Sequence, residues 1–455
     1  MGKMFGTDGV RGVANGDLTP ELAFQLGRAG AWVLTQGKSS RRERPLIVIG
    51  RDTRISGDML EAAMVAGFTS VGIDVARLGI VPTPAVAYLT RHLEADAGVM
   101  ISASHNPVPD NGIKFFTSDG FKLPDETEAE IEALVTATLR GSGDIPRPVG
   151  EGVGRAREYT KATEDYVNLL IQTVNHRLDG MRIVVDCANG AAFEVAPEVL
   201  TRLGAEVVAI NTGSSGKDIN VNCGSTYPQV LQAAVKEYGA DVGIAHDGDG
   251  DRVIAVDEQG QIVNGDGILA ICAIELMSRG QLAKNTIAAT VYSNLGLKKA
   301  IEKHGGKLVV TPNGDRYVLE AMLQQGLDLG GEQSGHIIFL RHNTTGDGVL
   351  TALQLLAAVK GRNQPLSQLA QVLTPFPQLL QNISVRDKRW EDREVICRTI
   401  EQAEAMLGTE GRIYVRASGT EPVIRVMGES SDEDLLREAV DMISRVIKAE
   451  LGADR

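Results

Sequence analysis

The sequence predicts a protein of the α/β class with a smaller α+β region at its C-terminal end. The chain has 455 residues, a length typical of two to four domains. Short apolar runs alternate with helical patterns through most of this length, as in mostly parallel sheets covered by helices. Glycine is frequent, with 51 residues, whereas aromatic residues make up only 4%. We therefore expect aliphatic cores and many glycine-containing loops.

The first predicted domain covers residues 1–152. A helix is expected after Thr19 and Pro20, because threonine is a good N-cap and proline suits the first helical position. The Gly/Pro-rich stretch at 141–150 indicates the end of this domain. The other expected elements are a strand at 45–50, a helix from 58 to about 72 and a strand near 99–102.

The second and third predicted domains, residues 153–258 and 259–373, repeat this alternation. In the second we expect a helix near 155–172 and strands at 182–186, 206–210 and 241–245. In the third we expect strands at 286–291, 307–310 and 327–331, and a helix near 348–360.

The pattern changes after Pro375, so the fourth predicted domain covers residues 374–455. Short strands are expected at 381–385, 411–415 and 423–427, followed by a helix from about 432 to 451. This order of elements is typical of a small α+β domain.

The formal net charge of −13 limits the possible partners. Acidity at this level disfavours a general role in coating nucleic acid or an anionic membrane. Any phosphate that the protein binds must therefore be held by a local basic site.

Localisation follows from what the sequence does not contain. No stretch reaches the roughly 18 apolar residues of a membrane span, and the start has no apolar signal core. Four cysteines lie far apart, with no metal-binding spacing: Cys187, Cys223, Cys272 and Cys397. We expect reduced thiols in a cytoplasmic protein.

Three carboxylates on alternate residues form a candidate metal site: Asp247, Asp249 and Asp251, in the run DGDGDR at 247–252. Their mutual repulsion is relieved by a hard divalent cation, and oxygen ligands favour Mg²⁺ or Ca²⁺ over zinc. An EF-hand is excluded because Arg252 occupies the sixth loop position, where glycine is required, and because the flanks resemble strands. The alternative is a solvated acidic turn.

A candidate nucleophile, Ser104, lies in the run ASHNP at 103–107, after a predicted strand. Small hydroxyl residues at the carboxyl end of a strand are placed where α/β proteins bind ligands. A serine facing a magnesium site suits phosphoryl transfer. On an extended chain the neighbouring His105 points away, which disfavours a Ser–His pair. The alternative is a serine that only caps a turn.

The run RASGTEP at 416–422, with Arg425 shortly after it, is a candidate phosphate site. Hydroxyl groups and closely spaced backbone N–H groups, together with Arg416 and Arg425, can hold phosphate oxygens. The alternative is a surface hairpin with incidental arginines. The run GGEQSGH at 330–336 could hydrogen-bond sugar hydroxyls, but alone it is a weak signal, as is Arg11 near the start. No Walker A motif is present.

Together these segments resemble the α-D-phosphohexomutase superfamily, and most closely its bacterial phosphoglucosamine mutase branch. The resemblance covers essentially the whole chain in order and spacing. It rests on FGTDGVRG at 5–12, ASHNP followed by DNGIK at 110–114, DGDGDR, GGEQSGH and RASGTEP. The resemblance implies three α/β domains with mixed sheets and a smaller α+β domain, all four around one central cleft.

The resemblance also implies reversible conversion of glucosamine 6-phosphate to glucosamine 1-phosphate, a step toward UDP-N-acetylglucosamine. Ser104 would carry the transferred phosphoryl group and join the three aspartates around one Mg²⁺, with glucosamine 1,6-bisphosphate as the intermediate. Arg11 and Lys114 would lie near the transferring group, and Lys114 or His336 would accept the proton. The residues implied to bind substrate are Glu332, Ser334, Arg416, Ser418, Gly419, Thr420 and Arg425.

Two alternatives remain open. Within the superfamily, the chain could be a phosphomannomutase/phosphoglucomutase. Outside enzymes, it could be a non-catalytic sensor of sugar phosphates. The sequence does not decide between a monomer and a homodimer.

Overall fold

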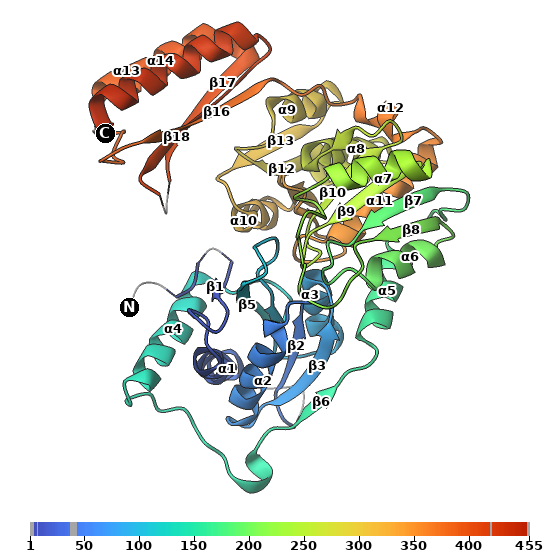
Figure 1. Ribbon diagram of the computed structural model, residues 1–455, viewed down its shortest axis with the longest axis vertical. Helices are drawn as coiled ribbons and strands as arrows, with labels where there is room; N and C mark the ends of the chain where they lie inside the picture. The colour runs from blue at the N-terminus through green and yellow to red at the C-terminus, as the bar shows by residue number, and fades with distance from the viewer. Residues whose placement is uncertain (1–3, 7, 37–42, 419–420, 453–455) are drawn as a thin grey trace.

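The computed structural model describes residues 4–6, 8–36, 43–418 and 421–452. Across these residues the chain forms four sheets, one after another, each with its own helices (Figure 1). The first three sheets are mixed and the fourth is antiparallel. The predicted fold class, three α/β domains with mixed sheets and a smaller α+β domain, is confirmed.

The first sheet has the strand order β1-β5-β4-β2-β3-β6. Its strands are β1 (Val10–Val13), β2 (Leu46–Arg51), β3 (Asp74–Ile80), β4 (Ala97–Ile101), β5 (Asp110–Thr117) and β6 (Ala156–Glu158). Its helices are α1 (Pro20–Thr35), α2 (Ser56–Thr69), α3 (Thr83–His92) and α4 (Asp125–Leu139). As predicted, Thr19 caps α1 by accepting the backbone N–H of Leu22. β4 and β5 are antiparallel neighbours, so the loop between them lies at the carboxyl end of β4.

The helix expected near 155–172 is only partly correct. Residues Ala156–Glu158 form β6, which pairs in parallel with β3, and α5 begins at Ala162. The backbone N–H of Val75 donates to the carbonyl of Arg155 at 2.8 Å. This exposed segment therefore completes the edge of the first sheet and does not start a helix, although its local sequence permits one.

The second sheet has the order β11-β10-β9-β7-β8. Its strands are β7 (Arg182–Asp186), β8 (Glu206–Ile210), β9 (Val242–His246), β10 (Val253–Asp257) and β11 (Ile262–Val263). Its helices are α5 (Ala162–Gln172), α6 (Val195–Arg202) and α7 (Gln229–Tyr238). β9 and β10 are antiparallel, and the aspartate-rich run is the loop that joins them.

The third sheet has the order β13-β12-β14-β15. Its strands are β12 (Thr286–Thr290), β13 (Lys307–Thr311), β14 (Leu329–Gly331) and β15 (Ile337–Phe339). Its helices are α8 (Gly265–Ser278), α9 (Leu295–Lys303), α10 (Asp315–Gln325), α11 (Gly348–Arg362) and the short α12 (Leu366–Ala370). The GGEQSGH run joins β14 to β15, its antiparallel neighbour.

The fourth sheet has the order β16-β18-β17. Its strands are β16 (Gln378–Ser384), β17 (Gly411–Ala417) and β18 (Val423–Ser430), and its helices are α13 (Glu394–Leu407) and α14 (Glu433–Leu451). β17 and β18 pair as an antiparallel hairpin, and Arg416 and Arg425 of the predicted phosphate site lie on its two strands. We call this element the arginine hairpin, because Arg416 and Arg425 lie on it.

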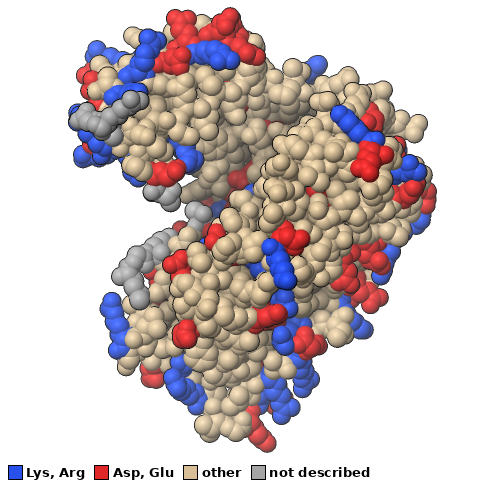
Figure 2. Space-filling view, viewed as in Figure 1, with Lys and Arg blue, Asp and Glu red and all other residues tan. Residues whose placement is uncertain are grey.

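The first three domains share one hydrophobic core, and the fourth domain has its own. One continuous cluster joins the first three sheets, for example through Val86 of α3, Val167 of α5 and Leu353 of α11. The C-terminal domain has a separate core, which includes Ile424 and Ile443. In Figure 1 this domain stands apart from the N-terminal domain, and Figure 2 shows the surface hollowed between them. The predicted domain boundaries stay predictions.

Within the described residues, no helix combines the length and the apolar character that a membrane span requires. All four cysteines are free thiols, and three of them are buried.

Candidate active site

Ser104 lies in the loop after β4 in an unusual backbone conformation. Its φ is +52°, a left-handed value that costs a residue other than glycine about 1–3 kcal/mol. The surroundings hold it there, because the Ser104 carbonyl accepts hydrogen bonds from Arg54 at 3.0 Å and Asn220 at 2.9 Å. The Ser104 hydroxyl donates to Oδ2 of Asp247 at 2.7 Å.

The left-handed conformation also corrects one expectation. His105 does not point away from the serine, because its Nδ1 lies 3.2 Å from Ser104 Oγ. The expectation assumed an extended chain, and the positive φ of Ser104 turns the next residue back. Burial, together with the nearby Arg252 and Arg11, lowers the pKa of His105 to about 4, so its ring is neutral. Because the hydroxyl donates to Asp247, Nδ1 must donate to Oγ for both contacts to be hydrogen bonds.

Arg54 fixes the shape of the whole serine loop, and the sequence-based reasoning missed it. Its buried guanidinium pairs with Asp52 at 3.0 Å. It also donates to four loop carbonyls at 2.5–3.0 Å, those of Ser104, Asn106, Pro107 and Asp110. The only sequence feature that could have indicated Arg54 is its position: Asp52 and Arg54 form a charged pair directly after the buried strand β2.

The three aspartates of the β9–β10 loop converge behind the serine. Asp247, Asp249 and Asp251 are buried, and one carboxylate oxygen of each lies within 4.8 Å of the others. The approach requires glycine, because a Cβ at Gly248 would lie 2.5 Å from the Ser104 carbonyl oxygen. The three carboxylates and the Ser104 hydroxyl therefore face one another across two domains.

This donor set fits a divalent cation. One oxygen of Asp249 and one of Asp251 are buried without a hydrogen-bond partner. Burial, with the nearby charges of Asp251 and Asp249, raises the pKa of Asp247 well above its ordinary value. A hard cation with oxygen ligands would relieve both the repulsion and the missing partners.

Lys114 and Arg11 supply positive charge beside the aspartates. The buried Nζ of Lys114, on β5, lies 2.8 Å from Oδ2 of Asp249 and 3.4 Å from Oδ2 of Asp8. Burial alone would lower the pKa of Lys114, but these carboxylates raise it above its ordinary value. Arg11, on β1, pairs with Asp8 and donates to Asn106 of the serine loop at 3.4 Å.

His336, in the β14–β15 loop, lies between Asp251 of the β9–β10 loop and Asp315 of α10. Its Nδ1 lies 3.4 Å from Asp251 and its Nε2 lies 3.4 Å from Asp315. These two carboxylates raise the pKa of His336 to about 9, against the effect of burial. The backbone N–H of Gly346 points at Nε2 from 3.1 Å, a hydrogen bond only in the neutral ring. The carboxylates therefore favour the imidazolium and the Gly346 N–H favours the neutral ring.

A cavity of about 500 Å³ opens in front of these groups. Its lining includes Arg11, His105, Asp251, Glu332, Ser334 and His336. Ser334 donates to Glu332 at 3.3 Å within the β14–β15 loop, so the predicted sugar-binding pair lies together on the wall of the cavity. The structure thus brings together the predicted residues of the first three domains.

The described phosphate-site residues, Arg416, Ser418 and Arg425, belong to the arginine hairpin and do not line this cavity. Arg416 and Arg425 are paired directly across the two strands. Like charges in this position destabilise a sheet, and an anion between them removes the repulsion. Ser418 is buried and accepts the backbone N–H of Glu421 at 3.2 Å. Gly419 and Thr420 lie outside the described residues.

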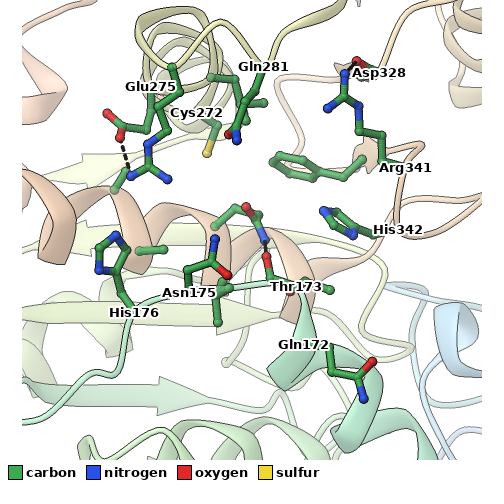
Figure 3. Close-up of a pocket in the computed structure, with 17 residues that line it drawn as sticks. Gln172, Thr173, Asn175, His176, Cys272, Glu275, Gln281, Asp328, Arg341 and His342 are labelled. Carbon is green, nitrogen blue, oxygen red and sulfur yellow. Dashed lines mark hydrogen bonds and ion pairs between the residues drawn. The ribbon is translucent and has the colours of Figure 1, made fainter.

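A second cavity, of about 260 Å³, lies on another side of the molecule, between the end of α5 and helices α8 and α11. Figure 3 shows His176 and Asn175 on one side of it and Glu275 and Gln281 on the other. Its arginines are already paired, Arg279 with Glu275 and Arg341 with Asp328, both at 2.6 Å. None of the predicted site residues lines it, so the chemistry belongs to the first cavity.

Four charged residues of the first cavity were missed by the sequence-based reasoning: Asp8, Lys122, Arg252 and Asp315. Lys122 bridges Asp8 of the first domain and Asp315 of the third, with both distances 2.6 Å. These two pairs join residues 114 and 193 positions apart in the sequence, which no local pattern can indicate.

Comparison with known proteins identifies the family. Models for alpha/beta/alpha domains I, II and III of phosphoglucomutase/phosphomannomutase match residues 2–140, 157–260 and 264–376, and the model for its C-terminal domain matches residues 380–446. A phosphoglucosamine mutase from Desulforamulus reducens is 55% identical over 98% of this chain and 99% of its own length. The chain belongs to the phosphoglucosamine mutase family.

Solved structures agree with the fold of a phosphoglucosamine mutase. A phosphoglucomutase/phosphomannomutase family protein from Burkholderia thailandensis superposes with a TM-score of 0.81 at 25% identity, covering 99% of both chains. The N-acetylphosphoglucosamine mutase of Aspergillus fumigatus, solved with GlcNAc-6P and magnesium, gives a TM-score of 0.69 at 18% identity, covering 97% of this chain and 95% of its own. Members of the phosphoglucosamine mutase family are phosphotransferases of the isomerase class, and this chain is such an enzyme.

Proposed function

We propose that this enzyme interconverts glucosamine 6-phosphate and glucosamine 1-phosphate through a phosphoserine at Ser104 and glucosamine 1,6-bisphosphate. The product would supply the synthesis of UDP-N-acetylglucosamine. The observation that carries the proposal is the contact between Ser104 and Asp247, 2.7 Å between Oγ and Oδ2, in front of three converging carboxylates. A serine in this position is suited to carry a phosphoryl group and not only to cap a turn.

We propose that Asp247, Asp249, Asp251 and the phosphorylated Ser104 hold one Mg²⁺. When bound, the ion would neutralise charge on the oxygens of the transferring phosphoryl group. The unpartnered buried oxygens of Asp249 and Asp251 support this ligand set. EDTA should abolish turnover and added Mg²⁺ should restore it, whereas activity that persists in EDTA would contradict this role of the aspartates.

In the forward half-reaction, the C1 hydroxyl of glucosamine 6-phosphate attacks the phosphorus of the phosphate on Ser104. A new P–O bond to the sugar forms while the P–Oγ bond breaks, and Arg11 and Lys114 balance the charge on the phosphoryl oxygens. The hydroxyl proton would pass to Lys114 or His336. Either can accept it only in its neutral form, which the neighbouring carboxylates disfavour in both residues before the substrate binds. The bisphosphate then turns over and returns its other phosphoryl group to Ser104, which releases glucosamine 1-phosphate.

Two loops share the recognition of the substrate in its two orientations. Glu332 and Ser334 offer one carboxylate and one hydroxyl to sugar hydroxyls that both poses present. The phosphate that is not reacting is proposed to be bound by Arg416, Ser418, Gly419, Thr420 and Arg425. The direct pairing of Arg416 with Arg425 supports an anion at this position.

We propose that the reaction takes place in the cytoplasm and that the substrate is a small phosphosugar, with no nucleic-acid or membrane partner. Four free cysteines support a reducing compartment, and the net charge of −13 disfavours polyanionic partners.

The test compares kcat/KM for glucosamine, glucose and mannose phosphates on the same preparation. We expect the highest value for glucosamine 6-phosphate. A preference for mannose 6-phosphate would favour the alternative, a phosphomannomutase/phosphoglucomutase. Absence of turnover with all three, with binding retained, would favour a sensor.

A further inference from the structure

Tyr292 connects the active-site cavity to the arginine hairpin. It follows β12, lines the cavity and is only half-buried. The guanidinium carbon of Arg416 lies 5.2 Å from the centre of the Tyr292 ring. Tyr414 of β17 packs edge-on against the same ring at 5.9 Å. One aromatic side chain of the third domain therefore faces the cavity and contacts a predicted phosphate-binding arginine of the fourth.

Arg416 and Arg425 differ in their partners, although the Nε of each is buried without a hydrogen bond. Arg425 is paired with Glu421 at 2.8 Å. In the described part of the chain, Arg416 has no acidic partner, and its Nε is buried without a hydrogen bond. The face of Tyr292 is thus the main contact that orients its guanidinium.

The segment after Tyr292 is firmly attached to the fourth domain. The buried Glu429 of β18 accepts the backbone N–H of Leu295 at 3.0 Å and the side-chain amide of Asn294 at 3.1 Å. Arg412 of β17 donates to the carbonyl of Ser293 at 2.5 Å. These bonds hold the backbone that follows Tyr292 against the fourth domain, beside the hairpin.

We propose that Tyr292 is a positioning residue that holds the Arg416 guanidinium for the non-reacting phosphate of the substrate. This inference rests on the proposed function of the arginine hairpin. Contact with a ring face leaves the in-plane N–H donors of arginine available, so Arg416 can still bind phosphate oxygens in a bidentate manner. An acidic partner would fix the side chain equally well but would occupy those donors.

The Tyr292 ring, and not its hydroxyl, performs this role. Within the described residues the hydroxyl has no hydrogen-bond partner, whereas both aromatic contacts use the ring. A phenylalanine should therefore replace Tyr292, and a leucine should not. Because the cation–π contact is lost, we expect KM for glucosamine 6-phosphate to rise about tenfold in Tyr292→Leu.

The experiment measures kcat and KM for Tyr292→Leu, Tyr292→Phe and the control Tyr238→Leu, an exposed tyrosine on α7. We expect Tyr292→Leu to raise KM with kcat nearly unchanged, because the non-reacting phosphate is held equally in the ground and transition states. Tyr292→Phe should restore the KM. An unchanged KM in Tyr292→Leu, or a KM in Tyr292→Phe as high as in Tyr292→Leu, would overturn the inference.

A double-mutant cycle separates positioning from packing. If Tyr292 acts through Arg416, then Tyr292→Leu should change KM less than about twofold in an Arg416→Ala background. If the ring only packs the two domains together, the tenfold change should persist there, which would overturn the inference. A wild-type enzyme without activity on glucosamine phosphates would instead refute the proposed function, so the two failures are distinguishable.

Discussion

The two regions proposed to bind substrate phosphates are built in different ways. Around Ser104, charged groups are buried and held by several partners each, as Arg54 is by Asp52 and four carbonyls. On the arginine hairpin, Arg416 is held by a ring face, and Arg425 by one acid. The serine region lies on the core that joins three domains, and the hairpin belongs to a domain with its own core.

This difference teaches how one site can serve two substrate orientations. The group that transfers phosphoryl must keep a fixed geometry, because small displacements reduce the rate strongly. The group that holds the other phosphate needs free donors more than rigidity, and its separate domain permits adjustment. Changes in the serine region should therefore lower kcat, and changes in the hairpin should raise KM.

The largest effect is expected from Ser104→Ala. Removal of the acceptor oxygen should lower kcat by about 10⁴-fold or more while leaving the fold intact. A coupled mutase assay measures this, with Ser70→Ala at the end of α2 as the control. Full activity in Ser104→Ala would exclude the phosphoserine route.

Arg54→Lys should come second. Lysine cannot make the fork of hydrogen bonds that holds the serine loop, so buried carbonyls lose their partners. We expect kcat to fall about 100-fold with KM changed little, and the free energy of unfolding to fall by about 2–4 kcal/mol. Steady-state kinetics and urea unfolding test this, with Arg157→Lys, an exposed arginine on β6, as the matched control. A rise in KM alone would show that Arg54 serves binding and not loop geometry.

In the hairpin, Arg425→Lys should raise KM about tenfold and leave kcat nearly unchanged. Arg425 is proposed to help hold the non-reacting phosphate in every state of the reaction, and a lysine, which lacks the planar guanidinium, would hold it less well. The same assay measures it, with Arg437→Lys on α14 as the control. A large loss of kcat instead would remove the distinction between the two regions.

How far the sequence predicts this site depends on the range of each interaction. The serine, the three aspartates and the arginine hairpin lie in short runs whose residue types already indicate their chemistry. His105 was wrongly placed because a single positive φ at Ser104 reverses the direction of the next side chain. Lys122 and Asp315 were missed because their pairing exists only after distant segments fold together. Likewise β6 was predicted as helix because its strand partner, β3, is remote in sequence.

The smallest effect concerns Asp266 of α8. It accepts the backbone N–H of Asn294 at 2.7 Å, and Asn294 in turn bonds Glu429 of the fourth domain. Burial raises the pKa of Asp266 to about 6. The pKa of this carboxyl is about 3.9 in the unfolded state and is therefore higher in the folded state. Its contribution to the free energy of unfolding is full below about pH 4 and is lost as the pH rises from about 4 to 6.

Asp266→Asn should therefore gain stability relative to the wild type between pH 4 and pH 7, by roughly 2 kcal/mol. Urea unfolding of both proteins at several pH values measures this, with the exposed Asp441→Asn as the control. A stability difference that does not change with pH would contradict the raised pKa.

The central claim is that Ser104 carries the phosphoryl group that is exchanged with the sugar. Intact-mass measurement and peptide mapping test it directly, before and after addition of glucosamine 1,6-bisphosphate and then of excess glucosamine 6-phosphate. We predict one phosphate on Ser104 after the first addition and its transfer to sugar after the second. A phosphate on another residue, or one on Ser104 that the sugar phosphate cannot remove, would contradict the account.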